Sequence, residues 1–147
     1  MTPNMLPWET LQALLAVYQT ITTANGYLTN IGDNASLENP QQEVEKLPDL
    51  AITGRPKDGG EQGDLFRSWT MEVFLEARVP ASRQDAQFTA WKVHADLLAA
   101  TPKPKRDDSL PKGAHSIKVE SSSIVQDTPS RPFVVVQVVL SIGLVVT

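Results

Sequence analysis

Two carboxylates near the middle of the chain have a spacing that could carry acid–base chemistry. Glu72 and Glu76 lie four residues apart in a segment in which polar and apolar residues alternate, so both side chains project from one face of the predicted strand. Two carboxylates that flank a substrate can act as general acid and general base. The same spacing is also typical of the solvated or partner-facing side of a sheet, and the sequence favours this second interpretation.

The histidines and the missing cysteines argue against a catalytic or metal site. His94 and His115 do not occur at metal-ligand spacing, and the chain contains no HExxH, GxSxG or SxxK motif. The absence of cysteine excludes a thiol nucleophile, a thiolate metal site and disulfide bonds. We therefore predict a protein that is not an enzyme and needs neither metal nor cofactor. The alternative is a small-molecule-binding domain or hydrolase that uses Glu72, Glu76 or His94.

A glycine-rich loop over residues 54–64 carries Arg55 and Lys57. It lacks a Gly-Lys-Ser/Thr sequence, and no helix follows it that could bind phosphate with its N-terminus. The spacing predicts a mobile connection between two strands.

A second loop, over residues 102–113, carries a short basic cluster. Lys103, Lys105 and Arg106 are followed at once by two aspartates, and the loop has no aromatic residue to stack on bases. These cations suit either a solvated loop or a contact with an acidic partner or passing nucleic acid.

The composition is that of one globular domain over residues 1–147, which is long enough to bury a sizeable core. The net charge of −4 gives no basic footprint for nucleic acid. Residues 1–64 hold 3 basic and 9 acidic residues (net −6), residues 65–100 hold 4 and 4 (net 0), and residues 101–147 hold 6 and 4 (net +2). Such a gradient suits a protein that stacks between differently charged neighbours.

Two amphipathic helices are predicted. The first spans residues 3–24 and ends at Asn25-Gly26, and the second is capped by Ser82 and ends at Pro102. The apolar faces expected to pack on the core are Trp8, Leu11, Leu15, Tyr18 and Thr22, flanked by Leu14 and Ile21, in the first helix, and Phe88, Trp91, Ala95, Leu98 and Ala99 in the second.

Strands are predicted over residues 27–31, 50–53, 65–79, 116–126 and 133–146. The last of these has no charge between Pro132 and Thr147, so we expect it to be central in its sheet or covered by another subunit, since a bare edge would aggregate. Its length is below the roughly 20 residues of a membrane span. We expect Trp69, Trp91 and Leu140 to lie in the core.

The order of these elements predicts an α+β fold: a small mixed or antiparallel sheet with two amphipathic helices packed on one face. Because two helices can cover only one face of a sheet, the other face must be polar or used in assembly.

Residues 21–32 read Ile-Thr-Thr-Ala-Asn-Gly-Tyr-Leu-Thr-Asn-Ile-Gly. This stretch resembles the opening of the tail terminator (tail completion, minor tail protein U-like) proteins of long-tailed bacteriophages, which combine a helix, the pattern Ile-Thr-x-Ala-Asn-Gly-Tyr and a strand ending in glycine. The later order is also similar: Leu47-Pro48 before a short strand, a long alternating strand, Asp96 in the second helix, and an apolar last strand. The basic segment that usually follows the first strand of the family is not evident, since residues 35–39 carry only Glu38.

The resemblance implies an architectural role without catalysis or cofactor. Such proteins form a ring, usually of six copies, that caps the head-proximal end of the tail tube, stops tube polymerisation and joins the tail to the head connector. The implied partners are further copies of the chain, the tail tube protein, the connector or neck protein and the tape measure protein, with genomic DNA only as passing cargo and no membrane.

The implied location is the tail or neck of the virion, after assembly in the host cytoplasm. Another neck or head–tail joining protein is the alternative that this resemblance leaves open. The residues expected to contact partners are Arg55, Lys57, Glu72, Glu76, Lys103, Lys105 and Arg106.

Overall fold

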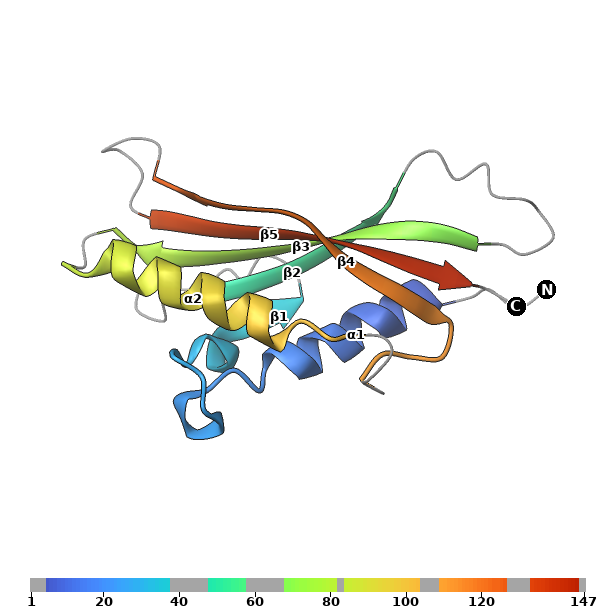
Figure 1. Ribbon diagram of the computed structural model, residues 1–147, viewed down its shortest axis with the longest axis horizontal. Coiled ribbons are helices and arrows are strands. Elements are labelled where there is room, and N and C mark those ends of the chain that lie inside the picture. Colours follow the sequence, from blue (N-terminus) through green and yellow to red (C-terminus); the bar gives the residue numbers. More distant parts are fainter. Residues whose placement is uncertain are drawn as a thin grey trace.

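The long alternating segment forms the middle of a five-stranded mixed sheet in the computed structural model (Figure 1). The structure describes residues 5–37, 48–57, 68–81, 84–103, 109–126 and 133–145. Its elements in chain order are α1 (Leu6–Tyr18), the 3-10 helices η1 (Thr23–Asn25) and η2 (Ile31–Asn34), β1 (Ala35–Leu37), β2 (Asp49–Pro56), β3 (Ser68–Pro80), α2 (Ala86–Ala100), β4 (Ala114–Val125) and β5 (Phe133–Val145). The strand order is β1-β2-β3-β5-β4, in which β1 and β2 are parallel and every other neighbouring pair is antiparallel.

Both helices lie against the same face of the sheet, and no described element covers the opposite face, which we call the open face (Figure 1). The predicted α+β architecture is therefore confirmed. The apolar last strand, β5, lies between β3 and β4, so its predicted central position is confirmed as well. Neither described helix is long and apolar enough to cross a membrane.

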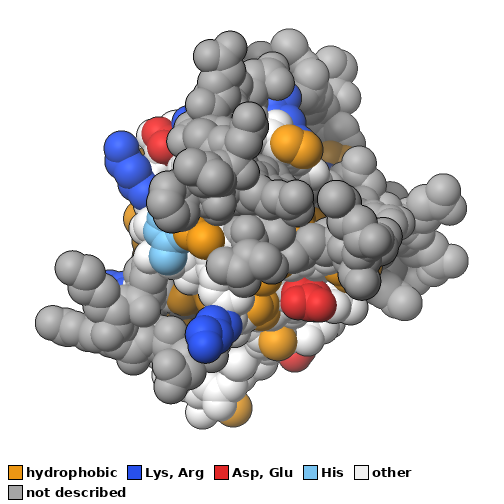
Figure 2. Space-filling view, turned by 90° about the vertical axis from the view of Figure 1, so that its right-hand side faces the viewer, with side chains coloured by type: hydrophobic (Ala, Val, Ile, Leu, Met, Phe, Trp, Pro, Cys, Tyr) orange, Lys and Arg blue, Asp and Glu red, His pale blue; other side chains and the backbone are white. Residues whose placement is uncertain are grey.

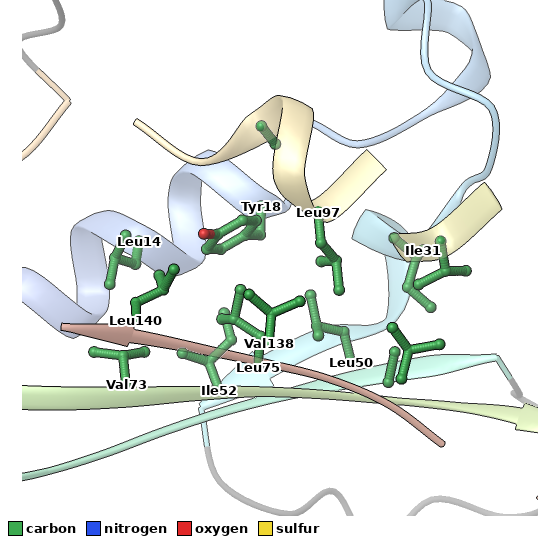
Figure 3. Packing of buried hydrophobic residues seen from close by; sticks show 14 of the residues in the cluster. Leu14, Tyr18, Ile31, Leu50, Ile52, Val73, Leu75, Leu97, Val138 and Leu140 are labelled. Carbon is green, nitrogen blue, oxygen red and sulfur yellow. The ribbon is translucent and has the colours of Figure 1, made fainter. Parts of the chain in front are cut away.

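The predicted alternation of β3 and β5 also holds. The odd positions of β3 and the even positions of β5 point toward the helices and are buried: Met71, Val73, Leu75, Ala77 and Val79, and Val134, Val136, Val138, Leu140, Ile142 and Leu144. Leu14 and Tyr18 of α1 and Leu97 of α2 lie over this apolar layer (Figure 3). The core thus sits between one face of the sheet and the two helices.

The first helix is shorter than predicted and ends at Tyr18. β-Branched residues follow, and the Thr20 hydroxyl donates a hydrogen bond to the Val17 carbonyl at 2.6 Å, which favours a turn over further helix. The predicted strand over residues 27–31 is wrong, because residues 27–30 form an irregular connection between the two 3-10 helices and Ile31 begins η2. A short strand, β1, occurs instead at Ala35–Leu37, where no strand is predicted.

The buried face of each helix differs from the predicted one. In α1 the buried residues are Leu6, Thr10, Leu14 and Tyr18, and Trp8 is exposed. In α2, which begins at Ala86 with Asp85 at its N-cap position, they are Ala86, Thr89, Ala90, Val93, Asp96, Leu97 and Ala100. The predicted stripe through Phe88 and Trp91 faces outward, so the expectation of a core Trp91 is wrong. Small residues on the inner face let α2 approach the sheet closely. The Trp69 side chain lies outside the described residues.

Replacing Tyr18 with Phe is expected to reduce the loss of stability at alkaline pH. Burial raises the pKa of the Tyr18 phenol from its ordinary value of 10 to about 12, partly offset by the hydrogen bond with the Thr101 hydroxyl. The folded state therefore favours the neutral phenol, which stabilises it fully below pH 10 and progressively less as the pH rises through about 12. Urea unfolding at a series of pH values measures the effect. Equal alkaline slopes in wild type and Tyr18→Phe would contradict it.

Candidate partner-binding surfaces

Four of the predicted partner residues come together at the open face of the sheet. Arg55 on β2 pairs in register with Glu72 on β3, and the Arg55 Nη2 atom lies 3.0 Å from Glu72 Oε1. Glu76 lies four residues further along the same face of β3, beyond Phe74, and is exposed. Lys57 follows the end of β2, where its backbone N–H donates to the Thr70 carbonyl. The predicted shared face of Glu72 and Glu76 is therefore confirmed, but Glu72 is engaged in an ion pair.

Charged side chains tie the strands of the open face together. Lys57 Nζ lies 3.9 Å from Glu120 Oε1 of β4, a contact that reaches across β3 and β5. The Arg55 guanidinium also lies over the Phe74 ring, 5.1 Å from its centroid. Charged side chains of this face thus lie beside its aromatic ones.

A buried ion pair that the sequence did not single out lies at the other end of the open face. Arg78 of β3 is in register with Asp49 of β2, and its guanidinium donates two hydrogen bonds to the buried Asp49 carboxylate. The hydrogen bond to Asp49 raises the pKa of Arg78 above its ordinary value. Arg78 also lies over the Phe133 ring at 5.1 Å. The alternation on β3 predicts that Arg78 points to the open face. Only the register between β2 and β3 identifies Asp49 as its partner.

The basic loop is only partly described. Lys103 is exposed just beyond α2, where it lines a shallow hollow with Tyr27 and Thr101 on the helix side of the molecule. It is therefore not part of the open face. Lys105 and Arg106 lie outside the described residues. At the end of the molecule shown in Figure 2, the described charged side chains are interspersed with hydrophobic ones and form no single-sign patch.

The two histidines lie in different elements, His94 in α2 and His115 in β4. His94 Nε2 on α2 lies 3.0 Å from the Ser122 hydroxyl of β4, and its ring meets the Trp91 ring edge-on at 5.6 Å. His115 is exposed near the start of β4. Within the described ranges no group of three or more His, Asp or Glu side chains could hold a metal ion.

The outer face of α2 exposes apolar side chains that the sequence predicts to be buried. Phe88 and Trp91 keep 66% and 59% of their surface exposed, and Leu98 keeps 39%. Lys92 Nζ lies 4.8 Å above the Phe88 ring. We call the exposed stripe of Phe88, Trp91, Ala95, Leu98 and Ala99 the α2 ridge. Its helical spacing is visible in the sequence, but periodicity alone does not say which of two possible faces is buried.

Residues 21–32, which carry the sequence resemblance described above, form a loop whose two ends lie side by side. The Gly32 N–H donates to the Ile21 carbonyl at 3.0 Å, and Ile21 and Ile31 are both buried. Asp96 of α2 anchors its middle: the buried carboxylate accepts hydrogen bonds from the Leu28 N–H (3.0 Å), the Thr29 N–H (2.8 Å) and the Thr29 hydroxyl (2.7 Å). The loop thereby presents an exposed Leu28 beside the α2 ridge.

Gly32→Ala is expected to lower the free energy of unfolding by about 2 kcal/mol or more. An added Cβ would lie 2.6–2.8 Å from the carbonyl oxygens of Tyr18, Gln19 and Ile21, and backbone atoms cannot move aside as a side chain can. Gly26→Ala is the matched control: its φ of +92° costs strain of about 1 kcal/mol, but no atom lies within 4 Å of the new Cβ. Chemical denaturation measures both. A smaller effect at position 32 than at position 26 would overturn the packing described.

Comparison with known proteins adds little to this picture. No protein-family model matches the chain, and no curated protein sequence matches it either. A solved structure of a protein without a descriptive name aligns with 92% of this chain and 95% of its own, at 13% identity and a TM-score of 0.43. Similarity at this level carries no argument. The function must therefore be inferred from the chain's own sequence and surfaces.

Proposed function

We propose that the protein is a phage tail terminator: a virion protein that forms a ring, of six copies by analogy with the family, on the head-proximal end of the tail tube. The ring would stop tube polymerisation and receive the head connector. The observation that carries the proposal is the α2 ridge, a row of aromatic and aliphatic side chains that a single copy leaves exposed. Monomeric soluble proteins rarely leave such a contiguous patch uncovered unless it binds something.

Two further observations support an assembly role. The open face adds a second surface that the chain's own helices leave bare, and charged side chains on it pair between strands. The resemblance of residues 21–32 to tail terminators indicates which assembly the protein would form, namely a ring on the tail tube. In the structure this segment is fixed to α2 through Asp96, so it lies beside the α2 ridge.

The test uses the purified full chain and tail tubes of the phage that encodes it. Native mass measurement and electron microscopy should find a ring that caps one end of each tube, even if the free chain is monomeric. A chain that neither forms rings nor binds tube ends would refute the proposal. Antibody or gold labelling in the virion then separates a tail terminator, at the tube end, from another neck protein, which would lie nearer the head.

A catalytic function is the competing hypothesis. A substrate and thermal-shift screen with the wild type, Glu72→Ala and His94→Ala tests it. We expect no turnover that depends on either residue, because Glu72 is paired with Arg55 on the open face, whereas His94 lies on α2, on the other side of the sheet. Turnover lost in either variant would overturn the structural role.

A further inference from the structure

We propose that neighbouring copies contact each other through two different surfaces, the α2 ridge of one copy packing on the open face of the next. This inference rests on the proposed ring and names the interface that would build it. The occupant of the α2 ridge is thus a second copy of this chain.

The α2 ridge has the features of an interface anchor. Trp91 is more than half exposed, yet its ring is held by His94, which is in turn bonded to Ser122 of β4. Phe88 is covered on one side by Lys92. Aromatic side chains that are already fixed in the free protein lose little conformational entropy on binding, and Trp is among the residues that contribute most to interfaces.

The open face offers a matching surface. Val135 and Val139 of β5 and Phe74 of β3 are partly exposed on it, with the polar pair Glu76 and Gln137 between them. A mixture of apolar and polar side chains is the usual composition of a non-obligate protein interface.

Charge also favours this pairing. The cation Lys92 stands beside Phe88 on the α2 ridge, and the exposed carboxylate of Glu76 lies on the open face near Val135 and Val139. Opposite charges across an interface fix the register of a contact more than they add to its affinity.

The positions of the two surfaces determine the kind of assembly. The helices and the open face lie on opposite sides of the sheet (Figure 1). A contact between two different surfaces of the same chain is heterologous, and repeated copies then form a ring if the rotation closes. A contact of the α2 ridge with itself would end at a dimer. The proposed interface therefore explains how one chain without a second partner could close a ring.

The cysteine-free sequence makes the test direct. Ala95→Cys marks the α2 ridge, Val139→Cys marks the open face, and Glu9→Cys on the exposed side of α1 is the matched control. Rings are assembled on tail tubes from mixtures of two single variants and treated with a short bis-maleimide. We expect dimers from the Ala95→Cys and Val139→Cys mixture, none from either variant alone, and none when Glu9→Cys replaces Ala95→Cys.

Each outcome decides between the hypotheses. Rings that form without this cross-link, or Ala95→Cys that cross-links to itself, would overturn the proposed interface while leaving the ring function standing. Absence of any ring would refute the function and the interface together. A second variant, Trp91→Glu, should raise the concentration needed for ring formation by at least about tenfold without loss of folding, as expected for a central aromatic residue. Unchanged assembly in that variant would also overturn the interface.

Discussion

Leu140→Ala is expected to lower the free energy of unfolding by about 3–5 kcal/mol. Leu140 is fully buried on β5, paired with Val73 of β3 on one side and Val119 of β4 on the other, and it faces the layer of helices. Truncation there leaves a cavity at the centre of the sheet, where neighbouring strands cannot close in without breaking their hydrogen bonds.

Trp91→Ala is the control for this prediction. The larger side chain is 59% exposed and contacts His94 at the surface, so its truncation should cost about 1 kcal/mol or less. Urea unfolding followed by circular dichroism measures both variants, with the slope m checked for constancy. If Trp91→Ala costs as much as Leu140→Ala, the indole lies in the core and the orientation of α2 described above is wrong.

Asp96→Ala is expected to cost about 3 kcal/mol, the second largest effect. The change removes a buried carboxylate that accepts three hydrogen bonds from the loop over residues 27–30. The backbone N–H groups of Leu28 and Thr29 would then lack their acceptors, and the loop would separate from α2. A hydrogen bond to a charged acceptor is stronger than one to a neutral group, so both the charge and the geometry contribute.

Asp96→Asn separates these two contributions. It keeps one oxygen acceptor but places an amide group against an N–H donor, so we expect an intermediate loss of stability. Amide hydrogen exchange should show faster exchange at Leu28 and Thr29 in both variants, with the buried strands less affected. Unchanged exchange at these two amides in Asp96→Ala would show that the carboxylate does not anchor the loop.

The sheet could largely be predicted from the sequence because strand periodicity reports burial directly. The charge-free β5 and the alternation of β3 fix which side chains face the helices. Because two helices can cover only one face of a sheet, the number of predicted helices already implies that the other face is open.

The connections and the helix orientations could not be predicted in the same way. The loop over residues 27–31 is held by Asp96, which lies 67 residues from Thr29 in sequence, and local propensity carries no information about such a partner. On α2, both faces contain apolar residues at helical spacing. The face with the small side chains is buried because it lets the helix pack closely on the sheet, and the larger Phe88 and Trp91 remain outside.

The candidate site residues also differ in whether the sequence predicts their positions. Glu72 and Glu76 were predictable on one face because strand alternation places them there, whereas the predicted loop position of Arg55 is wrong, since β2 continues to Pro56 and sets Arg55 opposite Glu72. Lys103 lies on the helix side and does not join them. The residues of the α2 ridge form a stripe in the sequence that predicts a core-facing position, whereas the structure exposes Phe88, Trp91 and Leu98.

The proposed function is tested most directly by the length distribution of tubes polymerised from the tail tube protein of the same phage in the presence of this chain. The expected result is that added chain stops growth at once and leaves shorter tubes, each with a ring at one end only. Tubes that grow to the same lengths with and without the chain, and that carry no ring, would contradict the proposal.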